Sequence, residues 1–270
     1  MLRVLTTLCA LLLPASPVRA TETWTYFLTG DAADATPVRT EGGLLLAGGG
    51  GFADAAMRWF IAQAGGGDLV VLRASGADGY HDYLHRELGG VDSVETLLFH
   101  ARAAASDPRV LAIVARAEGI ILAGGDQARY VELWGGTPLA AALDAHVRAG
   151  RPLAGTSAGL AVMGEFIFSA REPGSLTSPL ALRDPFDPQV TLETDFLHLA
   201  LLRGVITDSH FAERARLGRS LVFLARLRAE HARPDLVGLG VDERTALAVA
   251  ADGTARVHSA TPEGSVWLLQ

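Results

Sequence analysis

Ser157 stands among small residues in a pattern that is typical of enzyme nucleophiles. The run 155–159 reads G-x-S-x-G and lies between an apolar stretch, 152–154, and a helical stretch, 160–163. A serine on a sharp strand-to-helix turn is lifted above its sheet, and small neighbours let the turn close. The backbone N–H of Ala158 would begin the helix, where the dipole favours negative charge, so we expect it to bind an oxyanion. The bare pattern also occurs in simple glycine–serine turns.

A serine nucleophile needs a base, and the base needs a group that orients it. His210 follows a short apolar strand expected over 205–207, so we expect it at the carboxyl edge of the same sheet. His258 is its only rival. Asp242 and Glu243 end another expected strand. Because adjacent strand residues point to opposite faces, at most one of these two carboxylates reaches His210, and the residues alone leave the choice open.

The loop after a strand expected over 119–123 offers further backbone donors. We expect the second oxyanion donor at Gly125 or Asp126, because this loop also follows the carboxyl end of a strand. No pair of histidines has a metal-ligand spacing such as H-E-x-x-H. We therefore predict no metal site and no cofactor.

Three arginines follow the candidate base closely. Arg216 and Arg219 can share a helix face, whereas Arg214 and Arg216 cannot. Taken alone, they are typical of an ordinary charged helix. With Asp208 ahead of them, they could instead build a polar pocket for a charged substrate.

Composition excludes several kinds of chemistry. All 23 basic residues are arginine, and the 270-residue chain contains no lysine and no asparagine. A Ser–Lys dyad, a lysine Schiff base and a Walker lysine are therefore excluded. The hydrophobic content of 49% is that of a folded protein, and the net charge of −7 argues against nucleic acid and anionic membranes as partners.

The first twenty residues read as a secretory signal peptide. Arg3 supplies a positive start, 4–13 is an apolar stretch too short for a stable membrane anchor, and small residues flank Arg19 before a cleavage site after Ala20. Cleavage removes Cys9, the only cysteine, so the mature chain can form no disulfide, zinc–thiolate site or cysteine nucleophile. We expect a periplasmic or secreted protein.

The order of elements predicts an α/β fold. Apolar stretches alternate with helical ones, which is typical of a parallel sheet covered by helices, with strands expected over 43–47, 68–73, 94–99, 119–123 and 152–156. A C-terminal antiparallel meander is expected from strands over 238–241, 246–250, 255–259 and 266–269. No interdomain linker is visible, so we expect a single domain over 21–270.

Four motifs, in this order, resemble the serine peptidase family of cyanophycinase and dipeptidase E. They are G-G-D-Q at 124–127, G-T-S-A-G at 155–159, D-x-H-F-x-x-R-x-R-x-x-R at 208–219 and G-V-D-E-x-T-A at 240–246. The resemblance covers about 43–250. It implies a Rossmann-like three-layer α/β/α sandwich similar to class I glutamine amidotransferases. It also implies Ser157 as nucleophile, His210 as base and Glu243 as the orienting acid.

The resemblance further implies a substrate pocket. The matching positions are Gln127, Asp208, Arg214, Arg216 and Arg219, together with Ser209, where cyanophycinases usually carry glutamine. Cyanophycinase releases β-Asp-Arg dipeptides from a polymer of aspartate with arginine branches, and dipeptidase E removes N-terminal aspartate from dipeptides. The implied partner is a peptide or a cyanophycin-like polymer. The shorter Ser209 removes an amide that could bind such a substrate.

The leading hypothesis is an exported serine peptidase that cleaves peptide or isopeptide bonds through an acyl-enzyme. A second hypothesis is an α/β-hydrolase-type esterase, whose chain order of serine, acid and histidine would require Asp242 or Asp252 with His258. A third is a non-catalytic binding module on the same scaffold. The sequence leaves open whether the chain forms a homodimer.

Overall fold

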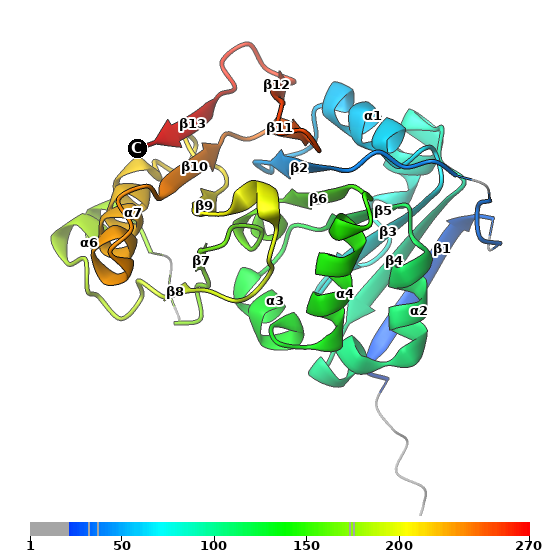
Figure 1. Cartoon of the computed structure of the whole chain (residues 1–270), viewed down its shortest axis with the longest axis horizontal. Coiled ribbons are helices and arrows are strands. Elements are labelled where there is room, and N and C mark those ends of the chain that lie inside the picture. Colours follow the sequence, from blue (N-terminus) through cyan, green and yellow to red (C-terminus); the bar gives the residue numbers. More distant parts are fainter. Residues whose placement is uncertain (1–21, 32, 37, 173, 175) are drawn as a thin grey trace, which may run out of the picture.

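The computed structural model describes residues 22–31, 33–36, 38–172, 174 and 176–270, so the expected signal peptide lies outside the described residues. Its centre is an eight-stranded sheet in the order β1-β4-β3-β5-β6-β2-β11-β12 (Figure 1). The five strands from β4 to β2 in this order run parallel, and the other three are antiparallel to their neighbours. The strands are β1 (Trp24–Gly30), β2 (Gly43–Ala47), β3 (Asp68–Arg73), β4 (Ser93–Phe99), β5 (Gly119–Leu122), β6 (Leu153–Thr156), β11 (Thr245–Ala250) and β12 (Ala255–Ser259).

Helices cover both faces of this sheet, which confirms the expected layered α/β fold. Leu44 and Leu46 of β2 belong to a core shared with α2, α3 and α4, whereas Leu45 belongs to a core shared with α1 and η1. This alternation follows from the period of two along a strand, and burial on both faces explains the continuous apolar runs. The helical elements here are α1 (Asp54–Gln63), the π-helix η1 (Asp82–Leu88), the 3-10 helix η2 (Arg102–Ser106), α2 (Pro108–Arg116), α3 (Gln127–Trp134), α4 (Pro138–Arg148) and α5 (Ala158–Ala161).

A second, smaller sheet lies beside the first, in the order β13-β10-β9. Its strands are β9 (Val205–Asp208), β10 (Val237–Val241) and β13 (Val266–Leu269), with β9 and β10 parallel and β13 antiparallel to β10. The helices α6 (Ser178–Arg183) and α7 (Leu217–His231) share a third core with it. The remaining elements are the 3-10 helix η3 (Ala200–Leu202) and the short pair β7 (Ile167–Phe168) and β8 (Leu192–Glu193).

The small sheet corrects two expectations. The C-terminal strands do not form one meander, because β10 and β13 join the small sheet while β11 and β12 extend the large one. The strand before His210, β9, also belongs to the small sheet rather than to the parallel sheet of the nucleophile. The site expected at one sheet edge is therefore assembled from two sheets.

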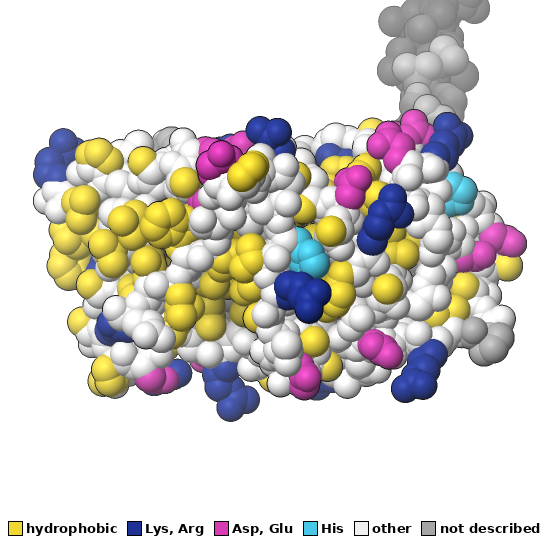
Figure 2. All heavy atoms as spheres, turned by 90° about the horizontal axis from the view of Figure 1, so that it is seen from above, with side chains coloured by type: hydrophobic (Ala, Val, Ile, Leu, Met, Phe, Trp, Pro, Cys, Tyr) yellow, Lys and Arg dark blue, Asp and Glu magenta, His cyan; other side chains and the backbone are white. Residues whose placement is uncertain are grey.

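The end of the molecule that carries the small sheet exposes several large hydrophobic side chains. Figure 2 shows hydrophobic side chains gathered there. The large exposed ones on α6, α7 and β13 are Leu182, Leu217, Leu221, Trp267 and Leu268. Within the part of the chain that the structure describes, no helix has the length and apolar character that crossing a membrane requires.

Candidate active site

Ser157 occupies a strained turn between β6 and α5. Its backbone has φ 53° and ψ −116°, a combination that costs a non-glycine residue on the order of 1–3 kcal/mol. The turn is tied to the neighbouring strand, because the Ser157 N–H donates to the carbonyl of Ala47 at 3.1 Å. The surrounding structure thus holds the serine in the raised position that its sequence motif predicts.

The two glycines of the motif are needed for packing. A Cβ at Gly155 would run into the Sδ of Met163 and the carbonyl of Gly159. A Cβ at Gly159 would overlap the carbonyl of Leu122 in β5. The second clash is with backbone, which cannot move aside as a flexible side chain can.

His210 reaches the nucleophile from the end of β9. Its Nε2 lies 2.7 Å from Ser157 Oγ, within hydrogen-bond distance. His210 has a positive φ of 46°, and its N–H donates to the carbonyl of Gly48 at 2.8 Å. The loop after β2 therefore fixes both the backbone and the direction of the imidazole.

Of the two carboxylates after β10, the structure brings Glu243 to the imidazole. Glu243 Oε1 lies 2.6 Å from His210 Nδ1. Asp242 points elsewhere and accepts hydrogen bonds from Ala212 N, Ser265 N and Trp267 Nε1. Asp242 thus ties the small sheet together, and Glu243 completes a continuous hydrogen-bonded chain from the serine to a carboxylate.

The rival histidine is not part of this arrangement. His258 lies on β12 and lines a different cavity together with Trp59 of α1 and Arg256. No hydrogen bond joins it to Ser157 among the described residues. The pairing of Ser157 with His258, which the esterase hypothesis requires, is therefore corrected: the base beside the serine is His210.

The surroundings favour a neutral imidazole at His210. Burial lowers its pKa below the usual 6.5, and the positive charges of Arg214 and Arg216 lower it further. The hydrogen bond with Glu243 opposes this shift without reversing it. A neutral His210 can accept a proton from Ser157 near neutral pH.

A cavity of about 420 Å³ opens directly beside this chain of hydrogen bonds. Its volume falls within the range of small-molecule sites. The lining residues are Gly49, Gly50, Gly51, Phe52, Tyr80, Tyr83, Gly124, Thr156, Ser157, His210 and Arg214. Arg214 is the only arginine among them, so it is the one of the three predicted arginines that can meet a substrate in this cavity.

The glycine loop after β2 forms one wall, and the sequence analysis did not assign it to the site. A Cβ at Gly49 would lie 2.5 Å from His210 Cε1 and 3.1 Å from Ser157 Cβ. A Cβ at Gly50 would lie 2.5 Å from Glu243 Oε2. All three members of the hydrogen-bonded chain therefore need glycine here. Four consecutive glycines at a strand end were the signal for this loop.

Aromatic side chains form another part of the cavity wall. Phe52 stacks on Tyr83 with ring centroids 5.7 Å apart and meets Tyr80 edge to face at 5.4 Å. The Tyr83 hydroxyl donates to Asp54 Oδ1 at 2.9 Å, which fixes the outer ring. This wall also escaped the sequence analysis, because the three aromatic residues come from the loop before α1 and from the region of η1.

The loop after β5 contributes Gly124 rather than the two expected residues. A Cβ at Gly124 would lie 3.4 Å from Ser157 Cβ, whereas Gly125 faces the hydroxyl groups of Tyr130 and Ser75. Asp126 caps α3 by accepting a hydrogen bond from Ala128 N at 2.9 Å. Gly125 and Asp126 do not line the cavity, and the binding of an oxyanion by their backbone N–H groups stays a prediction.

Ala158, the other expected oxyanion donor, is the first residue of α5 and is buried beside the serine. The first N–H groups of a helix have no partner within it. The backbone N–H of Ala158 is therefore placed at a helix start, as its position in the motif predicts.

Most of the expected substrate-binding residues form a buried network instead. Asp208 is bonded by Arg219 through Nε at 2.8 Å and Nη2 at 2.6 Å, and by Arg216 at 2.9 Å. Arg216 also donates to the carbonyl of Ser209 at 2.8 Å. Although burial opposes its charge, the two arginines hold the pKa of Asp208 below its usual value. Burial lowers the pKa of Arg216 to about 10.

This network differs from the expected arrangement, and a role of these residues in substrate binding stays a prediction. The polar groups of Asp208, Ser209, Arg216 and Arg219 are engaged with one another, and none of the four lines the cavity. Gln127 lies outside the cavity lining as well, and its side-chain amide donates to the carbonyl of Phe168 at 2.6 Å. Across the described ranges, no three histidine, aspartate or glutamate side chains gather in a way that could hold a metal ion.

Comparison with known proteins gives the same relationships as the motifs. The model of a family described as "Peptidase family S51" matches residues 74–257. Cyanophycinases from Synechococcus elongatus and Thermosynechococcus vestitus are each 38% identical over 207 residues, which cover 73% of this chain and 58% of each relative. This chain therefore spans less than two thirds of the length of these curated relatives.

A solved structure of a peptidase from an acI-B1 actinobacterium superposes with a TM-score of 0.58 at 18% identity, covering 84% of this chain and 94% of that one. At this identity the likeness shows the fold alone. The family match spans more than half of the chain, and its region contains the serine, the histidine and the glutamate described above. The chain belongs to peptidase family S51.

Proposed function

We propose that this protein is an exported serine peptidase that hydrolyses peptide or isopeptide bonds, including bonds of the β-aspartyl type. The single observation that carries the proposal is the continuous chain from Ser157 Oγ to His210 Nε2 and from His210 Nδ1 to Glu243, open to a cavity on the serine side. Nucleophile, base and orienting acid in this geometry are the parts of a catalytic triad.

The geometry supports acyl transfer in two stages. His210 takes the proton of Ser157 as the oxygen attacks the substrate carbonyl, and Glu243 stabilises the imidazolium that forms. Backbone N–H groups at Ala158 and along the Gly124 loop stabilise the negative charge on the carbonyl oxygen. His210 then protonates the leaving amine. Water attacks the acyl-enzyme with His210 again as base, which restores the serine.

The cavity favours a substrate that carries an acidic group near the scissile bond. Arg214 is exposed and lines the cavity, so its guanidinium is open to a ligand. The carboxylate of Glu243 is already bonded to His210 Nδ1. An arginine binds a carboxylate with two parallel hydrogen bonds. The matched relatives are named cyanophycinases. We therefore propose aspartyl-containing peptides, with cyanophycin first among them.

The primary test is hydrolysis by the Ser157→Ala variant. Incubation with cyanophycin and a panel of aspartyl dipeptides, with products identified by mass, should show turnover by the wild type and a loss of about 10³-fold or more in the variant. The Ser106→Ala variant is the matched control, because Ser106 is exposed at the end of η2. Full activity in Ser157→Ala would overturn the proposal.

A second test separates this proposal from its rivals. The His210→Ala variant should lose activity and the His258→Ala variant should keep it, whereas the reverse result would favour the esterase mechanism. A fluorophosphonate probe should label the wild type and fail to label Ser157→Ala. A wild-type protein that binds peptides but shows neither hydrolysis nor labelling would be a binding module.

Export rests on the sequence of the first twenty residues. Expression of the full chain in a Gram-negative bacterium should yield a periplasmic or secreted protein whose mass corresponds to a start at Thr21. Replacement of Leu11 and Leu12 by aspartate would break the apolar stretch and should leave the precursor uncleaved. A cytoplasmic, full-length wild-type protein would refute the export proposal and leave the enzymatic one intact.

A further inference from the structure

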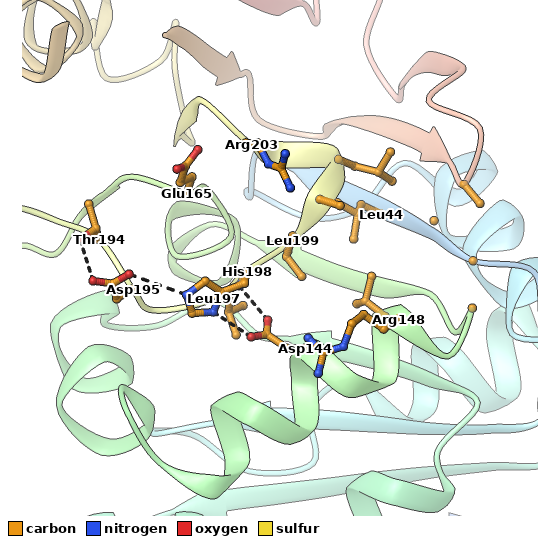
Figure 3. A pocket seen from close by; sticks show the side chains of 17 residues that line it. Leu44, Asp144, Arg148, Glu165, Thr194, Asp195, Leu197, His198, Leu199 and Arg203 are labelled. Atoms are coloured by element: carbon orange, nitrogen blue, oxygen red, sulfur yellow. Dashed lines mark hydrogen bonds and ion pairs between the residues drawn. The ribbon is translucent and has the colours of Figure 1, made fainter. Parts of the chain in front are cut away.

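A second and larger cavity, of about 660 Å³, lies at the far end of β2 from the active site (Figure 3). Gly43 and Leu44, at the start of β2, line this cavity, whereas Ala47 at the end of the same strand contacts Ser157. Ligands of open α/β sheets react at the carboxyl ends of the strands. This cavity is therefore separate from the proposed chemistry, and its use does not depend on it.

The cavity has an apolar wall. Leu44 comes from the large sheet, Val147 from α4, and Leu197, Leu199 and Leu201 from the segment before and within η3. Leu44, Leu197 and Leu199 are almost fully buried and form the floor of the wall, whereas Val147 and Leu201 are partly exposed to the space, which is large enough for a small molecule. An aliphatic group placed here would be removed from water on several sides.

Three acidic groups stand in the lining, and each already has a partner. Asp195 accepts a hydrogen bond from Thr194 Oγ1 at 3.1 Å and lies 3.7 Å from His198 Nε2. Asp144 accepts hydrogen bonds from the backbone N–H of His198 at 2.8 Å and from its Nδ1 at 2.9 Å. The hydrogen bond with Asp144 raises the pKa of His198, which favours a positive imidazolium beside the negative Asp144 carboxylate. Glu165 accepts a hydrogen bond from the N–H of Gly204 and lies 3.9 Å from an arginine of the small-sheet region, Arg233.

Two arginines in the lining lack such partners. Arg148 and Arg203 are exposed, and neither side chain makes a hydrogen bond or an ion pair with another described residue. Figure 3 shows Arg203 on the side of the cavity toward Glu165 and Arg148 on the side of Asp144. Asp144 precedes Arg148 by one helical turn, so its carboxylate competes with a bound anion for the Arg148 guanidinium. Arg203 is thus the more available cation.

We propose that this cavity binds a small amphiphile consisting of an aliphatic chain with one carboxylate. The chain lies against Val147 and Leu201, the partly exposed apolar side chains of the wall, and the carboxylate pairs with Arg203. The apolar wall removes the aliphatic chain from water. The unpaired guanidinium at its edge orients the ligand, because it can bind a carboxylate with two parallel hydrogen bonds. The site accepts an acidic aliphatic ligand and discriminates against the neutral molecule of the same length.

The test is a titration of the full-length protein with sodium octanoate below its micelle concentration, followed by calorimetry and by the leucine methyl signals in NMR spectra. Binding should shift the methyl signals of Leu201, the partly exposed leucine of the cavity wall. 1-Octanol should bind at least about tenfold more weakly, because it lacks the charge. No binding of octanoate, or equal binding of octanol, would overturn the proposal.

Matched arginine variants locate the carboxylate. Arg203→Ala should weaken octanoate binding by about tenfold. Arg148→Ala should weaken it less, and Arg183→Ala, an exposed arginine of α6 outside the cavity, should leave it unchanged.

Sedimentation velocity at the same concentrations tests whether a second copy of the chain occupies the cavity instead. A dimer that dissociates in Arg203→Ala and excludes octanoate would show that a second copy of the chain fills the cavity, which would refute the ligand proposal.

Discussion

Ser157 sits on a turn that is fixed by backbone contacts, whereas the end of β9, just before His210, is fixed by charged side chains. On the large sheet, the carbonyls of Ala47 and Leu122 leave room only for a tight turn built with glycine. On the small sheet, Asp208 binds the buried Arg219 and the mostly buried Arg216 just before the histidine. The two proposed catalytic partners are 2.7 Å apart, yet different forces position them.

This difference separates what a local sequence encodes from what it does not. Steric fit at a turn requires glycine at fixed offsets, and that requirement is visible in the chain itself. An ion network depends on which distant side chains meet after folding. Removing one partner of a buried ion pair is strongly destabilising, because the other charge stays buried without compensation. Steric variants therefore test the turn at Ser157, and charge variants test the network around Asp208.

The largest effect is expected where the charge network is broken. Asp208→Asn removes the negative charge and leaves Arg216 and Arg219 buried together, so the free energy of unfolding should fall by about 3–5 kcal/mol. Urea unfolding followed by circular dichroism measures this change. Asp78→Asn, at an exposed loop position, should change stability by less than about 0.5 kcal/mol. Equal stability of the two variants would show that the network does not hold the small sheet.

The steric region should respond to one added methyl group. Gly159→Ala forces a Cβ against the backbone of Leu122 and should lower the free energy of unfolding by about 3 kcal/mol, the upper end for overpacking. Gly79→Ala is the control, because a Cβ there meets nothing within 4 Å. Denaturant midpoints measured side by side decide the comparison. A stable, fully active Gly159→Ala would contradict the account of the turn.

A third variant acts where the two regions meet. Gly49→Ala places a Cβ 2.5 Å from His210 Cε1, so the imidazole must move away from Ser157. A displacement of about 1 Å costs about 10²-fold in rate, and we expect kcat to fall by that factor. Gly253→Ala is matched in its positive φ of 86° but has no neighbour within 4 Å, so it should keep full activity. Unchanged kcat in Gly49→Ala would mean that the glycine loop does not position the base.

The parallel core could be predicted from the sequence because its strands are buried on both faces. The expected strand over 43–47 matches β2, and the other four core strands match to within a residue or so. Trp24–Gly30 was missed, because this edge strand is only partly buried and mixes polar with aromatic residues. The C-terminal strands were found but wrongly paired, since a strand pattern does not state which sheet the strand joins.

The candidate site shows the same limit. Ser157 and His210 follow from motif and position, and their contact agrees with that reasoning. The choice between Asp242 and Glu243 needed the resemblance, because it depends on how β10 faces the large sheet. Arg219 looks like part of a solvated helix in the sequence, yet it is buried against Asp208. Its burial follows from the docking of α7, which no local pattern records.

The smallest expected effect concerns the charge on Arg214, the arginine that stays outside the buried network and lines the active-site cavity. Its positive charge lowers the pKa of His210, in addition to the larger effect of burial. Since only neutral imidazole accepts the serine proton, kcat/KM should fall as the pH drops through this pKa, with a midpoint below 6.5.

Arg214→Gln removes that charge, so the pKa of His210 should rise and the acid limb of the kcat/KM profile should move to higher pH. The KM for aspartyl substrates should rise as well, because the proposed carboxylate partner is lost. Arg183→Gln, exposed on α6, should leave both the profile and KM unchanged. An acid limb that stays in place while KM rises would show that Arg214 binds substrate without tuning the base. The pKa of His210 would then depend on burial, on the hydrogen bond with Glu243 and on the charge of Arg216.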